Sequence, residues 1–543
     1  MANTTNAASE KDWWRGAAIY QIYPRSYFDT NGDGLGDLNG VTEKLAHAAS
    51  LGVDAVWLSP FFKSPMADMG YDVSDFCDVD PIFGTLEDFN RTIERAHALG
   101  LKVIIDQVLS HTSDRHKWFE ESRKSRTNAK ADWYVWADPK PDGTPPNNWL
   151  SIFGGSAWEW DGKRKQYYLH NFLASQPDLN FHTAAVRKAV LETVEFWLKR
   201  GVDGLRLDTV NYYFHDRKLR DNPPTAKGGN LDIPDVNPYG WQDHIHDKTQ
   251  PENLGFLREL RSLLDRYDNR TTVGEIGDGA NSLKTLAAYT SGGDKLHMSY
   301  TFDLLSDDFS AAHIGKSVGA FEEGVKDGWV CWAFSNHDVR RHVSRFARAG
   351  ENPAEVARFA INILACLRGS ICLYQGEELG LGEADIAFED LRDPYGIRFW
   401  PAFKGRDGCR TPMPWTSSAP QAGFSGGKPW LPVPAEHRAL NAAAQDITLG
   451  STLKHYRAIL ALRKAHPALV KGNFALSESP ADVLSFVRTL GKEKLFCAFN
   501  FSRSAKTMLL PGRAEKTAYA HAANLADGKL VLGAMGAAII SLS

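Results

Sequence analysis

Three acidic residues stand at the ends of short apolar segments that lie far apart in the chain. Asp208 follows the segment GLRL, Glu275 lies near the end of TTVGEI, and Asp338 follows CWAFSNH. A lone aspartate is usually a helix cap or a surface ion-pair partner, but three carboxylates in equivalent places indicate a common site. Carboxylates on both sides of an acetal can cleave it, because one attacks the anomeric carbon while a protonated one gives its proton to the leaving oxygen. We expect Asp208 to be the nucleophile, Glu275 the proton donor and Asp338 the group that holds the distorted sugar.

One arginine and two histidines accompany these carboxylates. Arg206 comes two residues before Asp208, so the two side chains point the same way along a strand. Its positive charge would keep Asp208 ionised, as a nucleophile must be. Glu275 must instead carry a proton near neutral pH, and partial burial beside other carboxylates raises the pKa of such a group. His111 and His337 also fall at segment ends, and we expect both to donate hydrogen bonds to sugar hydroxyls.

An early turn, with the sequence DTNGDGLGD, carries oxygen ligands at alternating positions around glycines. Such hard donors suit Ca²⁺ or Mg²⁺. The ligands would be Asp29, Asn31, Asp33, Asp37 and the carbonyl of Leu35. The pattern is not an EF-hand, because the twelfth position, which should be Glu, is Gly40. The alternative is a turn that Asp and Asn side chains close on their own backbone.

The elements that must position the three carboxylates repeat as a strand followed by a helix. Apolar segments predict eight strands, at 16–24, 54–60, 102–108, 204–209, 271–276, 297–303, 331–338 and 369–375. Helical patterns follow several of them, at 41–51, 86–99, 184–200 and 251–267. Repeated βα units indicate an α/β fold with a parallel sheet, and eight units predict a closed (β/α)8 TIM barrel. Chemistry in such a barrel collects at the carboxyl ends of the strands, where the three carboxylates lie.

Two stretches interrupt this rhythm. Residues 111–181 are rich in Pro, Gly, Asn and Trp and are too many for an ordinary βα loop, so we predict a small domain inserted after the third strand. From 469 to 543 the chain alternates apolar and polar residues between turn signals, which predicts a C-terminal β-sandwich. The barrel domain would then consist of residues 1–110 and 182–468.

The composition limits the classes of molecule that we expect the protein to bind. With 62 Lys and Arg against 66 Asp and Glu, the formal net charge is −4, which offers no field for nucleic acid or for an anionic membrane. No apolar run approaches the ~20 residues of a membrane helix, and the polar N-terminus lacks a secretory signal, so we expect a cytoplasmic protein. Its six cysteines form no CxxC pair and are expected to be reduced. We expect a small-molecule partner and no organic cofactor, and the oligomeric state stays open.

Four segments together resemble the ordered signature regions of the α-amylase superfamily, glycoside hydrolase family thirteen. They are DQVLSH at 106–111, GLRLDTV at 204–210, VGEI at 273–276 and SNHD at 335–338. The segment QPDLN is similar to the further region that marks the oligo-1,6-glucosidase and α-glucosidase branch. The resemblance implies a nucleophile, an acid/base and a stabiliser at the three carboxylates named above, with the arginine and two histidines as their partners. It also implies a structural cation in the early turn.

The resemblance further implies how a terminal sugar is held. In this branch an Asp after the second strand pairs with an Arg after the eighth, and the matching residues here are Asp68 and Arg410. Tyr71, in the same loop as Asp68, would stack on the sugar. The alternative is a salt bridge between loops beside a packed aromatic ring. One departure from the family pattern is Ser110, which stands where the family usually has Asn before the first-region histidine.

Linkage and chain-length preferences are expected to depend on residues that follow the fourth strand. The residue after the nucleophile is Thr209. In this branch that position faces the aglycone, and a valine there goes with α-1,6 cleavage, whereas Thr, Ala or Gly goes with α-1,4. The proline-containing loop 211–250 is far longer than a usual connection, so we expect it to lie over the barrel mouth and to exclude long oligosaccharides. Alternatively it packs only on the inserted domain or on another subunit.

These features lead to a retaining, exo-acting α-glucosidase of small α-1,4-linked glucosides such as maltose as the main hypothesis. A transglucosylase, a sugar isomerase or an oligo-1,6-glucosidase would use the same three carboxylates. A non-catalytic relative that partners a membrane transporter would carry a membrane helix and would have lost the carboxylates. This chain has the carboxylates and no such helix in its sequence pattern.

Overall fold

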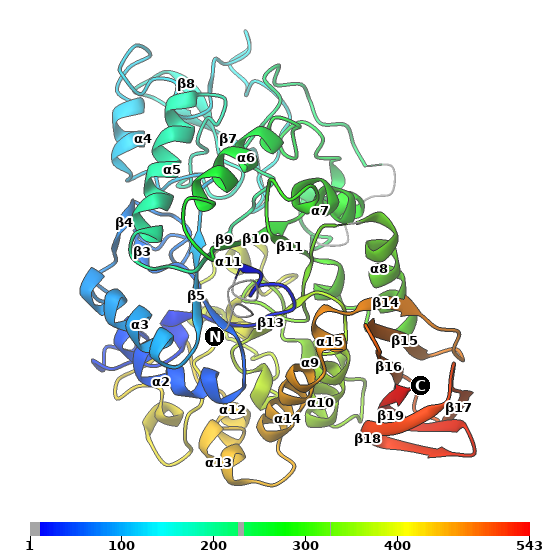
Figure 1. Cartoon of the computed structure of the whole chain (residues 1–543). Coiled ribbons are helices and arrows are strands. Elements are labelled where there is room, and N and C mark those ends of the chain that lie inside the picture. Colours follow the sequence, from blue (N-terminus) through cyan, green and yellow to red (C-terminus); the bar gives the residue numbers. More distant parts are fainter. Residues whose placement is uncertain (1–10, 226–232, 326) are drawn as a thin grey trace, which may run out of the picture.

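The centre of the molecule is a closed barrel of parallel strands (Figure 1). The structure, a computed structural model, describes residues 11–225, 233–325 and 327–543. The barrel strands are β1 (Ala18–Ile22), β2 (Ala55–Leu58), β5 (Lys102–Gln107), β9 (Gly204–Leu207), β10 (Thr271–Ile276), β11 (Met298–Thr301), β12 (Cys331–Ala333) and β13 (Ser370–Tyr374). They are hydrogen-bonded in the order β11-β10-β9-β5-β2-β1-β13-β12. A parallel bridge between Ser299 and Val330 joins the two ends, so the predicted (β/α)8 barrel is confirmed.

Helices surround the barrel in the predicted alternation with the strands (Figure 1). They include α2 (Leu38–Ser50), α3 (Leu86–Ala98), α5 (Ala184–Leu198), α6 (Asn253–Leu264), α7 (Ser282–Thr290), α8 (Ala311–Gly324), α10 (Pro353–Leu364) and α14 (Thr452–Ala465). Local sequence starts several of them, as at α3, where Thr85 and Asp88 form a capping box. Across the described ranges, none of the helices combines the length and the apolar character that crossing a membrane requires. All six cysteines are free thiols.

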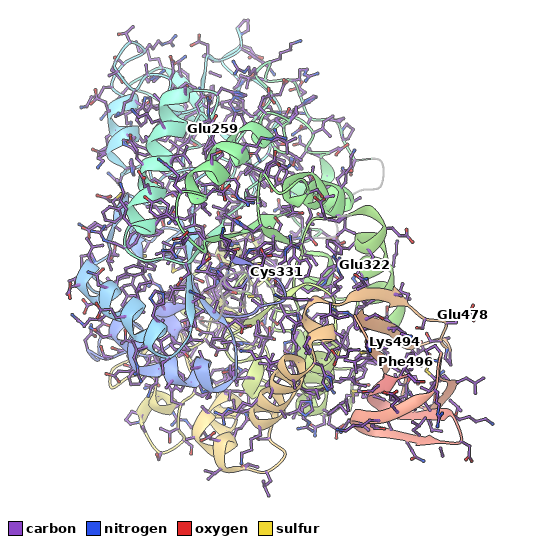
Figure 2. All side chains as sticks on the ribbon, in the orientation of Figure 1. Glu259, Glu322, Cys331, Glu478, Lys494 and Phe496 are labelled. Atoms are coloured by element: carbon purple, nitrogen blue, oxygen red, sulfur yellow. The ribbon has the colours of Figure 1, made fainter. Side chains whose placement is uncertain are left out.

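The alternation of side chains along each strand decides what the barrel interior contains. Ile104 of β5 and Val273 of β10 belong to the apolar cluster inside the barrel, as does Cys331, which Figure 2 shows near the centre of the molecule. Two residues further along the same strands, Asp106 and Glu275 take the same side and are buried at the carboxyl end. Because Ile104 and Val273 point into the barrel, Asp106 and Glu275 on the same strands also point inward and reach the barrel mouth.

The predicted inserted domain lies between β5 and α5. It contains α4 (Lys117–Ser122) and a three-stranded antiparallel sheet in the order β6-β8-β7, with β6 at Trp136–Ala137, β7 at Trp158–Asp161 and β8 at Gln166–Leu169. A core of its own includes Trp149, Trp158 and Leu169. An antiparallel bridge between His111 and Asp178 brings the two ends of the segment together, so the insertion leaves the barrel and returns to it at one place.

The C-terminal strands are antiparallel, as predicted, and lie beside the barrel (Figure 1). They are β14 (Asn473–Leu476), β15 (Val483–Leu490), β16 (Glu493–Asn500), β17 (Lys506–Leu509), β18 (Ala514–Ala526) and β19 (Lys529–Leu542). The long β19 pairs with β16 and β17 along one edge and with β18 along the other, which connects all six strands in one sheet rather than in two. Phe486 and Ile539 pack into the main core, whereas Phe496 and Ile540 form a second cluster.

Candidate active site

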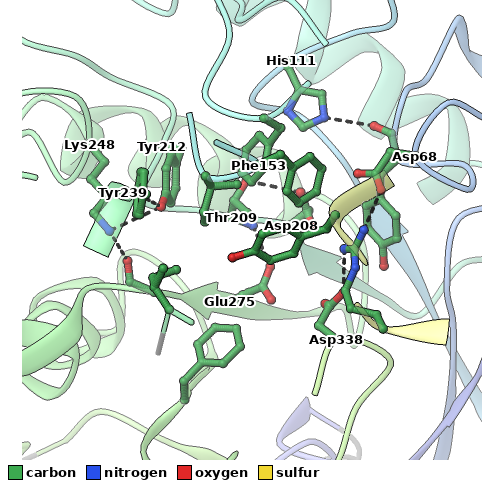
Figure 3. Close-up of a pocket in the computed structure, with 18 residues that line it drawn as sticks. Asp68, His111, Phe153, Asp208, Thr209, Tyr212, Tyr239, Lys248, Glu275 and Asp338 are labelled. Atoms are coloured by element: carbon green, nitrogen blue, oxygen red, sulfur yellow. Dashed lines mark hydrogen bonds and ion pairs between the residues drawn. The ribbon is translucent and has the colours of Figure 1, made fainter. Parts of the chain in front are cut away.

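The predicted catalytic carboxylates meet in a pocket at the carboxyl end of the barrel (Figure 3). The pocket is lined by Asp68, Tyr71, His111, Ile152, Phe153, Phe172, Asp208, Thr209, Tyr212, Ile233, Tyr239, Lys248, Glu275, Gly277, Phe302, Asp338, Tyr395 and Arg406. Three other predicted residues, Arg206, His337 and Arg410, do not line it and are fully buried beside it. The site therefore has a charged lining and a second layer of charged groups that hold it.

One buried guanidinium connects the carboxylates of three strands. Arg206 Nη1 lies 2.7 Å from Asp208 Oδ1 and 2.9 Å from Asp106 Oδ1. The other terminal nitrogen, Nη2, lies 2.6 Å from Glu275 Oε2. Nη2 also donates to the hydroxyl of Tyr300 at 2.7 Å, and that hydroxyl donates to Glu275 Oε1 at 3.0 Å. Because a single planar group contacts both Asp208 and Glu275, the two carboxyl groups are held close together.

Burial sets the protonation of the carboxylates. It raises the pKa of Glu275 to about 7, against the opposing charge of Arg206. It likewise raises the pKa of Asp208 to about 7, again against Arg206. Because the two carboxyl groups are buried side by side, ionisation of one disfavours ionisation of the other, which favours a proton on the pair. Burial also opposes the ionisation of Asp338, but a histidine and two arginines beside it prevail and hold its pKa below the usual range. The pocket thus contains one acid and two carboxylates, the set that acetal cleavage requires.

Thr209 connects the two catalytic carboxyl groups a second time. Its backbone N–H donates to Glu275 Oε2 at 3.0 Å, and its hydroxyl donates to Asp208 Oδ2 at 3.2 Å. Its φ of 39° lies in the left-handed region, which a β-branched residue rarely occupies, so these bonds hold a strained backbone in place. Ser110, the departure from the family pattern, lies 3.2 Å from Thr209 Oγ1 and 2.9 Å from His111 Nδ1. This serine therefore joins the linkage position to the first-region histidine.

The partner predicted for Asp68 is wrong. Asp68 pairs with Arg406, whose Nη2 lies 2.8 Å from Asp68 Oδ1, and not with Arg410. Arg410 instead donates through Nε to the carbonyl of His337 at 2.7 Å, and its Nη2 lies 3.0 Å from Asp338 Oδ1. The two arginines flank the 3₁₀ helix η7 (Asp407–Cys409); both reach Asp338, and the ion pair with Asp68 belongs to Arg406. Since both stand in the segment GRDGCR after the eighth strand, their spacing alone did not distinguish them.

Arg406 ties three carboxylates together at one end of the pocket. Besides Asp68, its guanidinium contacts Asp338 Oδ1 at 3.1 Å and Asp393 Oδ1 at 2.8 Å. Asp393 is fully buried and also accepts from the backbone N–H of Arg406 at 2.7 Å, which fixes the arginine from behind. One end of the pocket is therefore made of ionic groups that can accept and donate several hydrogen bonds.

The aromatic and histidine positions are partly as predicted. Tyr71 and His111 line the pocket, whereas His337 is buried behind it, stacked on Tyr71 with ring centroids 5.3 Å apart. His337 Nε2 lies 3.2 Å from Asp338 Oδ2, so this histidine contacts the stabilising carboxylate. His111 Nε2 donates to the carbonyl of Tyr71 at 3.0 Å, and burial lowers the pKa of His111 to about 4, which leaves the ring neutral. Hydrogen bonds from either ring to a sugar stay predictions.

The loop 211–250 forms the opposite end of the pocket. Its described parts, 211–225 and 233–250, contribute the lining residues Tyr212, Ile233, Tyr239 and Lys248. The same loop packs on the inserted domain, where Trp149 Nε1 donates to the carbonyl of Arg220 at 2.8 Å. The described parts of this loop therefore both line the pocket and pack on the inserted domain, and the exclusion of long oligosaccharides stays a prediction.

Several residues of the site were missed by the sequence prediction, among them Asp106, Arg406, Tyr300 and Lys248. Asp106 opens the quoted segment DQVLSH, and Arg406 lies in the segment that contains Arg410, so motif reasoning had come close to both. Tyr300 and Lys248 stand in no motif that we identified. Only the closure of the barrel and the course of a long loop bring these two side chains to the catalytic carboxylates.

A comparison with protein families identifies the family of this chain. The family model described as "Alpha amylase, catalytic domain" matches residues 21–472. The chain belongs to the α-amylase family. The three pocket carboxylates are the residues at which the resemblance of the signature segments implied the catalytic groups.

Within the α-amylase family the chain is similar to α-glucosidases. A probable alpha-glucosidase from Rhizobium meliloti (strain 1021) is 56% identical, over 99% of this chain and 98% of that protein. An oligo-1,6-glucosidase from Heyndrickxia coagulans is 37% identical, over 91% of this chain and 93% of that protein. These relatives confirm the predicted branch, and the chain is a glycoside hydrolase of the α-glucosidase type.

Solved structures show the same fold. The alpha-glucosyl transfer enzyme XgtA is 55% identical and superposes with a TM-score of 0.95, covering 98% of this chain and 99% of that chain. The trehalulose synthase MutB from Pseudomonas mesoacidophila MX-45 is 32% identical with a TM-score of 0.89, covering 98% and 99%. An alpha-glucosyl transfer enzyme and a trehalulose synthase thus share the architecture of this chain.

The predicted cation loop lies just before α2. Asp29 accepts hydrogen bonds from the backbone N–H groups of Asn31, Gly32 and Gly34, and Asp37 caps α2. Over residues 11–225, 233–325 and 327–543, no cluster of three or more His, Cys, Asp or Glu side chains is arranged to hold a metal ion. The side chains thus close the turn on its own backbone. Each carboxylate oxygen has further lone pairs, and the donor set is chemically suited to a hard cation, so Ca²⁺ or Mg²⁺ binding stays a prediction.

The pairing of Asp68 with Arg406 can be tested by double-mutant cycles. We expect Asp68→Asn and Arg406→Lys to be strongly non-additive in the inhibition constant of free glucose, with a coupling of about 1 kcal/mol or more, because the two side chains are in direct contact. Asp68→Asn with Arg410→Lys should show a clearly smaller coupling, because Arg410 is connected to Asp68 only through Asp338 and Arg406. Coupling in the second cycle and additivity in the first would restore the pairing that the sequence suggested.

The cation can be tested by thermal unfolding. If Ca²⁺ occupies loop 29–37, Ca²⁺ at millimolar concentration will raise the Tm of EDTA-treated protein by about 2–4 °C, because a ligand that binds only the folded state stabilises it. Asp33→Ala should abolish the shift. This carboxylate is the suitable one to remove, since it is exposed and holds only the N–H of Leu35 within the loop. An equal Tm with and without Ca²⁺ or Mg²⁺ would leave the loop as a simple turn.

Proposed function

We propose that the protein is a retaining, exo-acting α-glucosidase that removes the non-reducing terminal α-1,4-linked glucose from short substrates such as maltose. The observation that carries the proposal is the shared contact of Arg206 with Asp208 and Glu275 in a pocket that Asp68 and Arg406 close at one end. Each part of the proposal depends on a different feature of that pocket.

Exo action follows from the ionic end of the pocket. Arg406 with its carboxylates occupies the space through which a longer chain would have to continue beyond the terminal glucose. Asp68 and Asp338 accept hydrogen bonds, and Arg406 donates them, so this end suits the hydroxyls of one sugar ring. Burial raises the pKa of Asp68 to about 6, although Arg406 opposes the shift, so this carboxylate is largely ionised at neutral pH.

Retention follows from the spacing of the catalytic pair. A retaining enzyme needs its two carboxyl groups about 5–5.5 Å apart, whereas an inverting one leaves about 6.5–9.5 Å for a water molecule. A single guanidinium that contacts both Asp208 and Glu275 favours the shorter spacing. Thr209 supports it further, because it contacts the same two groups.

The reaction then has two steps. In the first, Asp208 attacks the anomeric carbon, the glycosidic C–O bond breaks, and Glu275 gives its proton to the departing oxygen. In the second, Glu275 takes a proton from water, whose oxygen attacks the anomeric carbon and releases Asp208. Arg206 stabilises whichever of its two partners is ionised, Asp208 before the first step and Glu275 after it, and Asp338 stays ionised to stabilise the positive sugar in each transition state.

The preference for short substrates rests on the loop 211–250, which lies over the aglycone end of the pocket. A transferring activity is the second candidate, because the transfer enzyme XgtA is 55% identical over nearly the whole chain. In that case the hydroxyl of another sugar replaces water in the second step, and the same residues carry both outcomes. The product mixture from dilute maltose distinguishes them, since isomers or longer glucosides dominate only if transfer does.

The nucleophile can be tested by substitution and by trapping. We expect Asp208→Asn to keep the fold and to lower kcat on an aryl α-glucoside by about 10³-fold or more, because the attacking oxygen is lost. Peptide mass spectrometry of Glu275→Gln mixed with α-glucosyl fluoride should show a glucosyl group on Asp208, since fluoride leaves without an acid and the second step lacks its base. Retained turnover in Asp208→Asn, or no adduct in Glu275→Gln, would contradict the retaining mechanism.

The linkage preference can be read from competing disaccharides. We expect a higher kcat/KM for maltose than for isomaltose, and expect Thr209→Val to shift that ratio towards isomaltose by about tenfold, because one group in a pocket is worth about 1–3 kcal/mol. The ratio is the proper readout, since the valine also removes the hydroxyl that bonds Asp208 and slows both substrates. Thr209→Ser keeps that hydroxyl and serves as the control. A wild-type preference for isomaltose would refute the assignment.

A further inference from the structure

A buried lysine lies at the end of the pocket that the mechanism above does not use. Lys248, on the loop 211–250, is only 4% exposed and lines the pocket. Figure 3 shows it on the side opposite Asp68 and Asp338, with Glu275 and Thr209 between them. Since Asp68 and Asp338 form the glucose end, Lys248 stands where the aglycone lies.

The ammonium of Lys248 has a donor to spare. Its Nζ donates to the carbonyl of Gly277 at 2.8 Å and to the hydroxyl of Tyr212 at 3.3 Å. An ammonium carries three N–H groups, and within the described ranges no third acceptor contacts this one. Burial opposes the charge, but Tyr212, Asp278 and Asp247 raise the pKa of Lys248 above its ordinary value, so it is charged at neutral pH.

The nearby carboxylates are engaged elsewhere. Asp247 accepts from His244 Nδ1 at 2.5 Å, and Asp278 accepts from the hydroxyl of Thr249 at 3.0 Å. Neither carboxylate lies within 4 Å of the lysine nitrogen as an ion pair among the described residues. They balance its charge from a distance, so a neutral hydroxyl rather than an anion suits the remaining N–H.

Anchoring of the loop does not explain a buried ammonium. Asn211 Nδ2 already donates to the carbonyl of Gly277 at 3.1 Å and to the hydroxyl of Thr249 at 3.0 Å, which ties both ends of the loop to the segment after β10. A charge costs free energy to bury unless it is well paired, and a neutral side chain would anchor the loop at a lower cost.

The surroundings make this ammonium the strongest donor at its end of the pocket. The neighbouring walls are Tyr212, Tyr239 and Phe302, and the two tyrosine hydroxyls bond one another at 2.8 Å. Gly277 follows Glu275 by two residues, so the carbonyl that holds Lys248 belongs to the strand end that carries the acid/base. A group fixed there is close to the oxygen that leaves.

We propose that Lys248 donates its third N–H to a hydroxyl of the aglycone sugar and determines which sugars serve as leaving group and as acceptor. The inference rests on the proposed glucosidase function and names a specificity-determining residue for it. The contact orders the sugar that departs in the first step, and by the reverse path it orders the sugar that attacks in the second. It plays no part when the leaving group is not a sugar or the attacking group is water.

The test compares maltose with α-glucosyl fluoride, which fills the glucose end alone. In Lys248→Met we expect kcat/KM for maltose to fall about tenfold to hundredfold, because a hydrogen bond from a charged donor is lost. Hydrolysis of glucosyl fluoride should stay within twofold of wild type, and the share of transfer products with added glucose should fall. Lys295→Met is the matched control, since Lys295 is also buried but precedes β11, at the other end of the barrel, and should change neither substrate.

The outcomes distinguish a failure of the inference about Lys248 from a failure of the proposed glucosidase function. Equal losses on both substrates in Lys248→Met would show a merely structural role, and unchanged maltose kinetics would show no contact; either overturns the inference. If wild type fails to hydrolyse glucosyl fluoride, the proposed function itself fails.

A second measurement begins with the wild-type enzyme and is then repeated in Lys248→Met. We consider maltose analogues that each lack one hydroxyl of the reducing glucose. In wild type, one of them should have a kcat/KM about tenfold or more below that of maltose. In Lys248→Met, the kcat/KM of the same analogue should equal the kcat/KM of maltose. An even response of wild type to all the analogues would also overturn the inference.

Discussion

The buried positive charge of Arg206 is the constraint on which the active site depends. A guanidinium without access to water needs negative partners, and Asp106, Asp208 and Glu275 supply them from the ends of three neighbouring strands. The same contacts hold those carboxylates together against their mutual repulsion. Removal of the arginine would leave several buried carboxylates uncompensated, so the geometry of the catalytic pair and its protonation have one common cause.

The two ends of the pocket differ in their chemistry, and this difference orients the substrate in the pocket. At one end Arg406 and its carboxylates offer an ionic, multiply hydrogen-bonded seat for a single sugar ring. At the other end, aromatic walls and one lysine come from a long loop that also packs on the inserted domain. The first end is shared by any substrate that yields glucose. The second decides what leaves and what may attack, which is where hydrolases and transferring relatives can diverge on one fold.

The sequence motifs did not determine which of the two arginines after the eighth strand pairs with Asp68. Arg406 and Arg410 lie on either side of a single helical turn, and one reaches Asp68 while the other holds His337 and Asp338 from behind. Both are buried among carboxylates, and both follow the strand that the family pattern specifies. Residue type and order limited the choice to this segment. The direction in which each side chain leaves the turn depends on the surrounding loops.

The sequence by itself determined the barrel, the inserted domain, the C-terminal strands and the three carboxylates that meet in the pocket. Hydrophobic periodicity specifies strands and helices locally, and strand alternation places Asp106 and Glu275 on the interior side together with Ile104 and Val273. Tertiary structure decided which arginine meets Asp68, and brought Tyr300 and Lys248 to the pocket. Those contacts join residues far apart in the chain through loops and barrel closure. No local pattern encodes such distances, because they depend on how every intervening element packs.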